Sequence, residues 1–534
     1  MKTLLKVYGG FLRTNRWRIA AFLILSVAHK VVSILTPMAT QQLVDAAVYP
    51  TADQSSVFMQ ATVRAVLLFL LFLLFLCTRY YMKSLIEIDA DAQKKSDILN
   101  SIPHKTMSGI TEKSSGFILQ LVSRDVEKSI GLVIYDLSVF LLNVVYVIIV
   151  FVLLLRYSPL LTLISSVLIP AFVWTTQHML PKIEHVNDEL NKTRDSLSNQ
   201  TEEIVAGAES IKSNNAYGFI SERIKKTIVR YRSLSMKSAR LDILYDLVMI
   251  TGIMNAGNIV IYVIGAFQIM KGAMTVGQLT GFALYFSSLW GIVEGFMDFF
   301  KNYSIKQLSL KRIAEFEEIP SENPHDEGVT IAGFESMALE DVSFSYGQHQ
   351  VLKKCNLVIN QGDKVLLSGA NGSGKSTIAK LLVNLIEPQG GKVLLNGLPL
   401  ADYRLSSLRE KIRFIPSSPF LFEGTVEDNL FGKGMDLQLL PLLAPETAVA
   451  PKGSNLSGGE KKLLQLEAAL SSSADFFILD EPLNYIDQKS VQQILSYISQ
   501  SYRNKTLLII SHQEDVFDTL VDRRLQLLGG SCTE

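Results

Sequence analysis

The chain has 534 residues, enough for about two to four domains. Its 51 basic and 51 acidic side chains balance, which excludes a general attraction to nucleic acid. Three scattered cysteines exclude a disulfide framework, and seven histidines show no zinc-ligand spacing. Hydrophobic residues make up 48% of the chain and the mean hydropathy is +0.25. Because the apolar residues concentrate before Lys301, the composition predicts a membrane half followed by a soluble half.

Six apolar runs precede Lys301, each close to the roughly 20 residues that a helix needs to cross a bilayer. They are Trp17–Met38, Val63–Tyr81, Leu132–Leu155, Leu160–Met179, Ile243–Ile269 and Leu279–Phe300. The leading segment and the long segments Lys83–Ile130 and Pro181–Asp242 are rich in Lys and Arg, whereas Ala39–Thr62 has none. The positive-inside rule therefore places the N-terminus and both long segments in the cytoplasm.

Both long cytoplasmic segments are predicted to be helical, because apolar residues recur at three- and four-residue steps, as in EEIVAGAESIK. Reversals are expected at Ser108–Phe117 and Asn214–Phe219. These turns are interpreted either as exposed loops or as the contacts through which the soluble half moves the membrane half.

Three charged residues, Lys30, Glu294 and Asp298, fall within the predicted spans. Charges inside a membrane are costly and usually face protein or water. Lys30 and Glu294 line a substrate cavity in one interpretation and are snorkelling or structurally paired in the other. Asp298 is near the cytoplasmic end of its span, which favours the second interpretation. Pro170 is expected to kink the fourth span.

The soluble half begins after an acidic, proline-containing linker, FEEIPSENPHDEG. The stretch KVLLSGANGSGKST then runs from a predicted strand into a helix and fits the phosphate-binding pattern GxxxxGK[ST]. Its glycines let backbone N–H groups surround phosphate oxygens, Lys375 neutralises phosphate charge, and Ser376 offers a hydroxyl to Mg²⁺. The predicted nucleotide-binding residues of this loop are Gly369, Asn371, Gly372, Gly374, Lys375, Ser376 and Thr377.

A second motif, ADFFILDEP, is a buried strand that ends in two carboxylates. Asp480 is predicted to hold Mg²⁺, and Glu481 to orient and deprotonate the attacking water. An ordinary strand followed by an acidic turn would not explain why this motif accompanies a phosphate-binding loop.

LSGGE, Leu456–Glu460, resembles the signature motif of ATP-binding cassette (ABC) transporters, and with the motifs above the resemblance extends over nearly the whole chain. It implies that Ser457, Gly458 and Gly459 touch the γ-phosphate of a nucleotide held by an opposing subunit. It also implies an adenine-stacking Tyr346, a D-loop at Asn484–Asp487 whose Asp487 belongs to the nucleotide site, and a switch histidine, His512. The expected cofactors are ATP and Mg²⁺.

Two features depart from that family's pattern. In FIPSSPFLFEGT, Ser417 stands where the family usually has a glutamine that contacts Mg²⁺ and water. A serine would reach the metal only through a bridging water, so Ser417 is a doubtful metal ligand. The short segment GKGMDLQLLPLLAPETAVAPKGSN replaces the usual helical subdomain, and the glutamate-containing segment that touches the coupling turns is not recognisable.

The sequence thus predicts an all-α six-helix transmembrane domain over 1–315, a linker over 316–330 and an α/β P-loop ATPase, the cassette, over 331–534. The resemblance implies a half-transporter that works in the bilayer as a dimer, more readily with a second copy than with a different chain. It would export a peptide, lipid or amphipathic molecule from a bacterial inner membrane, with the cassette in the cytoplasm. The alternatives are an importer on the same fold, one half of a heterodimer, an ATP-gated channel or regulator, and a soluble ABC ATPase acting on nucleic acid or ribosomes.

Overall fold

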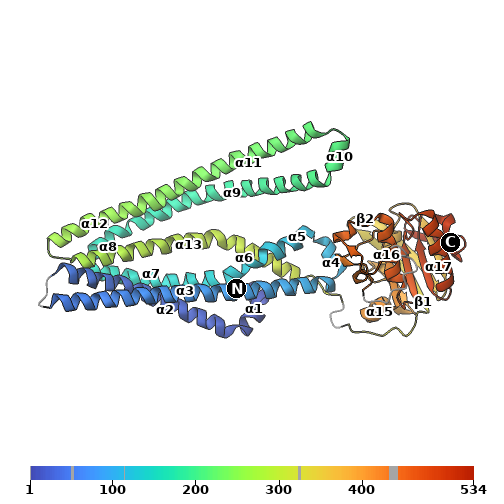
Figure 1. Ribbon diagram of the computed structural model, residues 1–534, viewed down its shortest axis with the longest axis horizontal. Helices are drawn as coiled ribbons and strands as arrows, with labels where there is room; N and C mark the ends of the chain where they lie inside the picture. Colours follow the sequence, from blue (N-terminus) through green and yellow to red (C-terminus); the bar gives the residue numbers. More distant parts are fainter. Residues whose placement is uncertain (1, 50–52, 114, 323–325, 432–442, 534) are drawn as a thin grey trace. The chain divides into compact units, whose positions relative to one another are not determined.

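The computed structural model describes residues 2–49, 53–113, 115–322, 326–431 and 443–533. It divides into two compact units, one made of Met1–Ser96 with Gln120–Glu315 and the other of Asp97–Leu119 with Phe316–Glu534 (Figure 1). The first unit is helical and the second contains all the named strands. This agrees with the predicted fold class, a helical membrane domain followed by an α/β domain, while the exact domain boundaries stay a prediction.

The helical unit contains long helices joined by short turns. Its α-helices are α1 (Lys2–Thr14), α2 (Arg16–Val48), α3 (Gln54–Ser101), α6 (Val126–Gly131), α7 (Leu137–Tyr157), α8 (Pro159–Ser166), α9 (Leu168–Ala206), α10 (Ala208–Ser213), α11 (Tyr217–Asp246), α12 (Asn255–Met270) and α13 (Val276–Glu317). Three π-helical segments interrupt them: η2 (Leu121–Asp125), η3 (Leu132–Asp136) and η4 (Leu247–Met254). The short helix α5 (Ser115–Gln120) belongs to the second unit except for its last residue.

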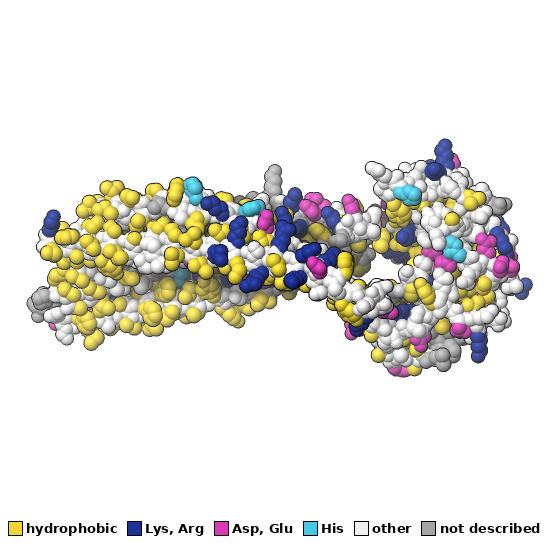
Figure 2. All heavy atoms as spheres, turned by 90° about the horizontal axis from the view of Figure 1, so that it is seen from above, with side chains coloured by type: hydrophobic (Ala, Val, Ile, Leu, Met, Phe, Trp, Pro, Cys, Tyr) yellow, Lys and Arg dark blue, Asp and Glu magenta, His cyan; other side chains and the backbone are white. Residues whose placement is uncertain are grey.

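In the described part of the chain, 5 helices are long and apolar enough to cross a membrane: Arg16–Val48, Gln54–His104, Gly116–Tyr157, Tyr217–Met270 and Val276–Val293. They contain the first, second, third and fifth predicted spans and most of the sixth. Figure 2 shows hydrophobic side chains over the part of the helical unit at the left, followed by Lys and Arg side chains on the helices beyond it. The chain is therefore a multi-pass integral membrane protein.

The fourth predicted span, Leu160–Met179, is not among those five helices, because it is interrupted. α8 ends at Ser166, α9 begins at Leu168, and Val167 lies between them. Pro170 explains the break, since it has no N–H to donate to the carbonyl of Ser166 and its ring crowds that carbonyl. The expected kink thus occurs one turn before the proline, and a crossing by this segment stays a prediction.

The two long segments that were predicted to be cytoplasmic are helical, as predicted. α9 and α11 pack as a long antiparallel pair, and the chain reverses at Asn214–Ala216, where Asn215 takes the left-handed value φ 52° (Figure 1). The first segment continues α3 to Ser101 and turns through a 3₁₀-helix, η1 (Ile102–His104), and α4 (Met107–Glu112). Lys105 Nζ donates to the carbonyls of Glu317 and Ile319, which fixes this turn against the end of α13.

A buried polar contact joins the helix before α7 to α13. Asp125, which is 3% exposed, accepts a hydrogen bond from Ser309 Oγ at 2.7 Å and lies 3.4 Å from Arg312 Nη1. Lys306, one turn earlier on α13, pairs with Asp136. Each acidic residue is the last residue of a π-helical segment, so η2 and η3 both present their final side chain to α13.

The second unit is built on a six-stranded sheet of order β12-β11-β3-β10-β9-β6. β11, β3, β10, β9 and β6 are parallel, and only β12 runs against its neighbour. The strands are β3 (Lys364–Gly369), β6 (Ile412–Ile415), β9 (Phe476–Asp480), β10 (Thr506–Ile510), β11 (Arg523–Leu528) and β12 (Ser531–Thr533). β9 and β10 are buried at every residue, which explains their unbroken apolar sequences.

Helices cover this sheet, and a smaller antiparallel sheet of order β2-β1-β4-β5 packs beside it in the same apolar core. The helices are α14 (Lys375–Leu382), α15 (Leu405–Lys411), α16 (Gly458–Leu470) and α17 (Gln488–Ser501). The smaller sheet comprises β1 (Ser336–Tyr346), β2 (His349–Asn360), β4 (Gly390–Leu395) and β5 (Leu398–Pro399).

The short segment that was predicted to replace a helical subdomain lies partly outside the described residues, at 432–442. Its described remainder forms β8 (Ala448–Val449), which pairs with β7 (Gly424–Thr425). Asn429, 2% exposed, closes the preceding loop, because its amide donates to the carbonyls of Phe422 and Thr425 and its oxygen accepts from Phe422 N–H. A small apolar core of Leu421, Val426, Leu430, Val449 and Leu464 fixes both arms to α16.

Candidate nucleotide site

The strand order explains why distant motifs meet. β10 lies between β3 and β9, and all three run in the same direction. The phosphate-binding loop follows β3, Asp480 ends β9, and His512 lies two residues after β10. Because ligands of open parallel sheets bind at the carboxyl ends of the strands, this edge is where a nucleotide is expected.

The phosphate-binding loop requires its glycines. Gly369, Gly372 and Gly374 have φ values of 147°, 77° and 109°. A Cβ on Gly374 would also come within 2.6 Å of Val351 Cγ1, and one on Gly369 within 2.8 Å of the Leu527 carbonyl oxygen. A side chain at any of the three positions would be strained, and at Gly369 and Gly374 it would also clash, so this loop conformation needs glycine.

Lys375 folds back over the loop in this structure. Its Nζ donates to the carbonyl oxygens of Gly369 at 2.7 Å and Ala370 at 2.9 Å. Burial lowers the pKa of Lys375, while the nearby carboxylates of Glu481 and Asp480 act in the opposite direction. A phosphate would replace two neutral acceptors by charged ones, which strengthens the hydrogen bonds of the ammonium group.

Glu481 is held in an uncommon backbone conformation. Its φ is 47°. Its N–H donates to the carbonyl oxygen of Ile510, the last residue of β10, over a distance of 2.8 Å. The side chain points toward His512, with 3.6 Å between Glu481 Oε1 and His512 Nε2. Glu481 Oε1 is buried and has no hydrogen-bond partner within the described chain. Strained backbone and an unsatisfied carboxylate oxygen are features of reactive sites.

These groups line one cavity of about 680 Å³. It contains most of the predicted site residues: Tyr346, Asn371, Gly372, Gly374, Lys375, Ser376, Thr377, Ser417, Asp480, Glu481 and His512. Gly369 contributes its carbonyl to Lys375 instead of lining the wall. Tyr346 ends β1 and is 48% exposed, so one face of its ring is available for stacking.

The signature residues do not line this cavity. Ser457 caps α16 through a capping box with Glu460, whose carboxylate accepts from the Ser457 N–H at 2.8 Å. Cβ atoms built on Gly458 and Gly459 would meet Tyr485, at 3.3 Å from its Cβ and 2.9 Å from its carbonyl oxygen. Asp487 likewise lies outside the cavity and caps α17 by accepting from Ser490 N–H. One chain therefore does not bring the signature to its own phosphate-binding loop.

The residues present fit a magnesium ion. Asp480 and Ser376 offer a carboxylate and a hydroxyl oxygen in the cavity, and Mg²⁺ prefers oxygen ligands, often one or two from protein and the rest from phosphates and water. No cluster of three or more His, Cys, Asp or Glu that could hold a metal occurs in the residues searched. A site that shares its metal with a nucleotide needs no such cluster.

Sequence reasoning missed Lys462. This lysine is 0% exposed, and its Nζ donates to the carbonyls of Pro416 at 2.9 Å and of Ser417 and Asp480 at 3.3 Å. Burial lowers the pKa of Lys462 to about 8, against the pull of Asp480 and Glu481. Lys462 thus ties the backbone of FIPSS to the end of β9. Its only sequence signal is its place in the second turn of the helix that follows LSGGE.

His349 was also missed, although it lines the cavity. It pairs with Tyr346 across the hairpin between β1 and β2. The available signal was its position three residues after Tyr346, beyond the turn that follows the predicted strand.

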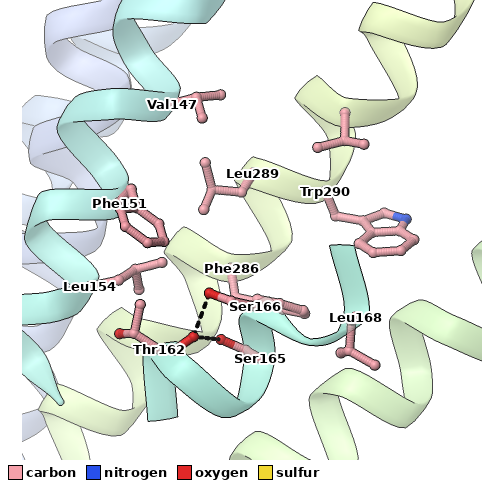
Figure 3. Close-up of a pocket in the computed structure, with 11 residues that line it drawn as sticks. Val147, Phe151, Leu154, Thr162, Ser165, Ser166, Leu168, Phe286, Leu289 and Trp290 are labelled. Carbon is pink, nitrogen blue, oxygen red and sulfur yellow. Dashed lines mark hydrogen bonds between the residues drawn. The ribbon is translucent and has the colours of Figure 1, made fainter. Parts of the chain in front are cut away.

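The membrane unit has its own apolar cavity of about 70 Å³ between α7, α8 and α13 (Figure 3). Phe151, Phe286 and Leu289 point into it, and the hydroxyls of Ser165 and Ser166 donate to the Thr162 carbonyl beside it. Its volume equals that of a few water molecules, too small for a cargo molecule. Of the predicted cavity residues, Lys30 lies outside it, and the side chains of Glu294 and Asp298 lie outside the described residues.

Two family models match the chain: ABC transporter transmembrane region over residues 19–293 and ABC transporter over residues 352–484. ABC transporter B family member 29, chloroplastic, of Arabidopsis thaliana is 27% identical over 384 residues, covering 67% of this chain and 60% of that protein. Antigen peptide transporter 2 of Rattus norvegicus is 25% identical over 462 residues, covering 82% and 65%. This chain thus spans about three fifths of the length of these relatives.

Among solved structures, a bacterial Atm1-family ABC exporter with ATP bound superposes with a TM-score of 0.81 over 97% of this chain and 95% of that chain. At 20% identity this likeness shows the fold alone. The transmembrane model by itself covers more than half of the residues, and the cassette model covers the phosphate-binding loop, the signature motif, Asp480 and Glu481. The chain belongs to the ABC transporter family.

Proposed function

We propose that this protein is an ATP-driven membrane transporter that exports an amphipathic molecule, peptide or lipid by alternating access. The observation that carries the proposal is the cavity in which Lys375, Asp480 and Glu481 converge, in a chain whose other unit has several helices able to cross a membrane. A protein that only binds nucleotide would need the phosphate-binding loop, but it would not need the carboxylate of Glu481 to lie beside His512.

Each residue of the cavity has a role that its geometry supports. Lys375 exchanges the carbonyls of Gly369 and Ala370 for phosphate oxygens, and Tyr346 stacks on the base. Glu481 accepts a proton from the attacking water, and His512 orients that carboxylate. Ser376 and Asp480 would hold Mg²⁺, which supplies charge neutralisation for the phosphates.

The working unit is proposed to be a dimer. Ser457, Gly458 and Gly459 stand at the start of α16, away from the cavity of the same chain. The N–H groups of a helix N-terminus suit a phosphate, so a second subunit would complete the site. A homodimer is favoured, because one chain carries both the signature and Glu481.

The membrane is proposed to be a bacterial inner membrane with the cassette on the cytoplasmic side. The support for the cytoplasmic side is the distribution of Lys and Arg, which are abundant before Trp17 and in the two long helical segments and absent from Ala39–Thr62.

ATPase activity of the chain in lipid nanodiscs tests this function. The wild type is expected to hydrolyse ATP, and Glu481→Gln to lose roughly 100-fold or more of the rate while still binding nucleotide. Glu387→Gln, an exposed glutamate of the same unit, is the matched control and should retain the rate. A Glu481→Gln variant as active as wild type would remove the proposed general base.

Transport direction is tested with inverted vesicles. ATP-dependent accumulation of a fluorescent amphipath inside them, absent with Glu481→Gln, supports export. Accumulation in right-side-out vesicles that contain ATP would instead establish import.

A further inference from the structure

Three basic side chains of the membrane unit lie where charges are costly. His29 and Arg79 are only 7% and 6% exposed, and Lys30 is half-buried next to His29. Both ring nitrogens of His29 and the Nε of Arg79 are buried and have no hydrogen-bond partner within the described chain. Buried donors without acceptors are destabilising, so an arrangement of this kind calls for a ligand or a functional reason.

The register of α2 against α3 brings these groups near one another. The two helices run antiparallel, with Arg18 Nη1 2.7 Å from Asp89 Oδ2 and Arg64 Nη1 2.9 Å from Gln42 Oε1. Between these contacts, the rings of His29 and Phe72 lie 4.9 Å apart. Counting eleven residues along each helix from the Arg18–Asp89 contact places His29 opposite Thr78 of α3, the neighbour of Arg79.

Ordinary counter-charges are missing from this cluster in the described part of the chain. Neither Lys30 nor Arg79 forms an ion pair there, whereas the neighbouring Lys83 pairs with Glu87 at 3.7 Å. Aromatic faces approach instead: Lys30 Nζ lies 4.7 Å from the Tyr146 ring centre and the Arg79 guanidinium 5.9 Å from that of Tyr135. A ring face attracts a cation but accepts no strong hydrogen bond, so the donors stay available.

Snorkelling accounts poorly for Arg79. A snorkelling arginine keeps its guanidinium in water, yet Arg79 is only 6% exposed and its Nε is inaccessible. The cluster is also deeper than the membrane surface, since Arg18, on the same helix as Lys30, already forms the exposed ion pair with Asp89.

We propose that His29, Lys30 and Arg79 bind the anionic group, a phosphate or a carboxylate, of an amphipathic molecule in the cytoplasmic half of the membrane. The planar guanidinium presents two parallel donors to such a group, and the ammonium and imidazole N–H add further ones. Phe72 and the leucines of α3 offer apolar surface for the tail. This assignment deepens the proposed transport function by naming the chemical class of its cargo, and it rests on that function.

Binding of radiolabelled dodecyl phosphate to the full chain, in nanodiscs of phosphatidylcholine, tests the site. Arg79→Gln and Lys30→Gln are each expected to weaken binding at least tenfold, while Arg79→Lys, which keeps the charge, loses less. Arg64→Gln is the matched control, an arginine of the same helix whose partner is the neutral Gln42, and it should bind as wild type. Dodecanol, which lacks the charge, should be insensitive to all four substitutions.

Unchanged affinity for dodecyl phosphate in both Arg79→Gln and Lys30→Gln would overturn the proposal. An equal loss of affinity for dodecanol in these two variants would also overturn it. A Gln variant that no longer binds ATP is misfolded, and the Arg79→Lys variant then tests the site. Dodecyl phosphate binding by Arg79→Lys supports the anion site. Loss of dodecyl phosphate binding in an Arg79→Lys protein that still binds ATP contradicts it.

Two sources of the anionic group are distinguished in the same system. Competition by phosphatidylglycerol without any ATP-dependent movement of dodecyl phosphate identifies a resident lipid, and ATP-dependent movement identifies a cargo; both support an anion site. Glu481→Gln should bind dodecyl phosphate like wild type. Binding without ATP hydrolysis by the wild type would therefore refute the transport function alone, and hydrolysis without binding would refute the anion site alone.

Discussion

The cassette and the membrane unit place their polar groups in different ways. In the cassette, three short motifs end on adjacent parallel strands, so residues such as Lys375, Asp480 and His512 reach one cavity through the backbone itself. In the membrane unit, His29 and Arg79 are single residues on separate helices, and they meet only through the register of those helices. The functional residues of the cassette can therefore be recognised from contiguous motifs, whereas those of the membrane unit are brought together only by the packing of its helices.

If this comparison holds, the largest effect of a single substitution in the membrane unit should come from a contact between helices. Asp125→Ala removes the buried acceptor of Ser309 and Arg312 on α13. We expect it to lower the free energy of unfolding by about 3 kcal/mol, near the low end for broken buried pairs, because Arg312 is still 31% exposed. Titration with sodium dodecyl sulfate, followed by circular dichroism, measures it.

Asp91→Asn is the control, since Asp91 pairs with Lys95 on one helix at 2.7 Å and both are partly exposed. It should cost less than about 0.5 kcal/mol. If Asp125→Ala and Asp91→Asn lowered the free energy of unfolding equally, the contact of Asp125 with α13 would contribute no more stability than an ion pair at the protein surface.

In the cassette, Lys462→Met tests a contact that could not be predicted from any sequence motif. Three carbonyl oxygens lose a charged donor in a buried position, which should cost about 2 to 3 kcal/mol. Calorimetry of the full chain should show a lower melting temperature, and Lys461→Met, on the more exposed neighbour, should have a much smaller effect. A Lys462→Met protein as stable as wild type would show that these hydrogen bonds are dispensable.

The same lysine predicts a pH dependence. Its folded pKa is about 8 and its ordinary value 10.5, so between these values the unfolded chain binds more protons and stability rises with pH. From pH 7.5 to 9.5 the gain in unfolding free energy from this group should be about 2 kcal/mol. Comparing wild type with Lys462→Met across this range isolates the contribution, and parallel curves would contradict it.

Lys375→Met tests whether the contiguous motif suffices to make the phosphate site. Loss of the ammonium should weaken ATP binding roughly 10- to 100-fold, the value of one or two charge-assisted hydrogen bonds. Lys380→Met, one turn further along α14, is the matched control and should leave the dissociation constant unchanged. An ATP affinity in Lys375→Met equal to that of wild type would mean that the loop glycines alone hold the phosphates.

The smallest effect is expected at Ser417. Ser417 lines the cavity, but its hydroxyl side chain is shorter than an amide side chain and would act on the metal only through water. We expect Ser417→Ala to change the ATPase rate by less than about threefold. A larger loss would show that the hydroxyl replaces the missing glutamine directly.

The comparison also explains which features were predictable. Apolar runs and the two strand-end motifs indicated the membrane half and the nucleotide site, because burial and the carboxyl edge of a parallel sheet follow from local sequence. Lys462 was not predictable, since its partners depend on how α16 packs against the chain after β6. The lack of hydrogen-bond partners for the His29 ring and for Arg79 Nε in the described chain depends likewise on which helix faces meet. The small core of Leu421, Val426, Leu430, Val449 and Leu464 also forms only in three dimensions, because its members come from separate segments.

The interruption at Val167 has a mechanical consequence. α9 begins there and continues for 39 residues, a rod of about 58 Å. A swing of only about 5° around the break would carry its far end, next to the reversal at Asn214–Ala216, through about 5 Å. A small change of angle at Val167 is thus amplified into a displacement about as long as one helical turn, and Pro170, which removes one backbone hydrogen bond, sets the position of the pivot.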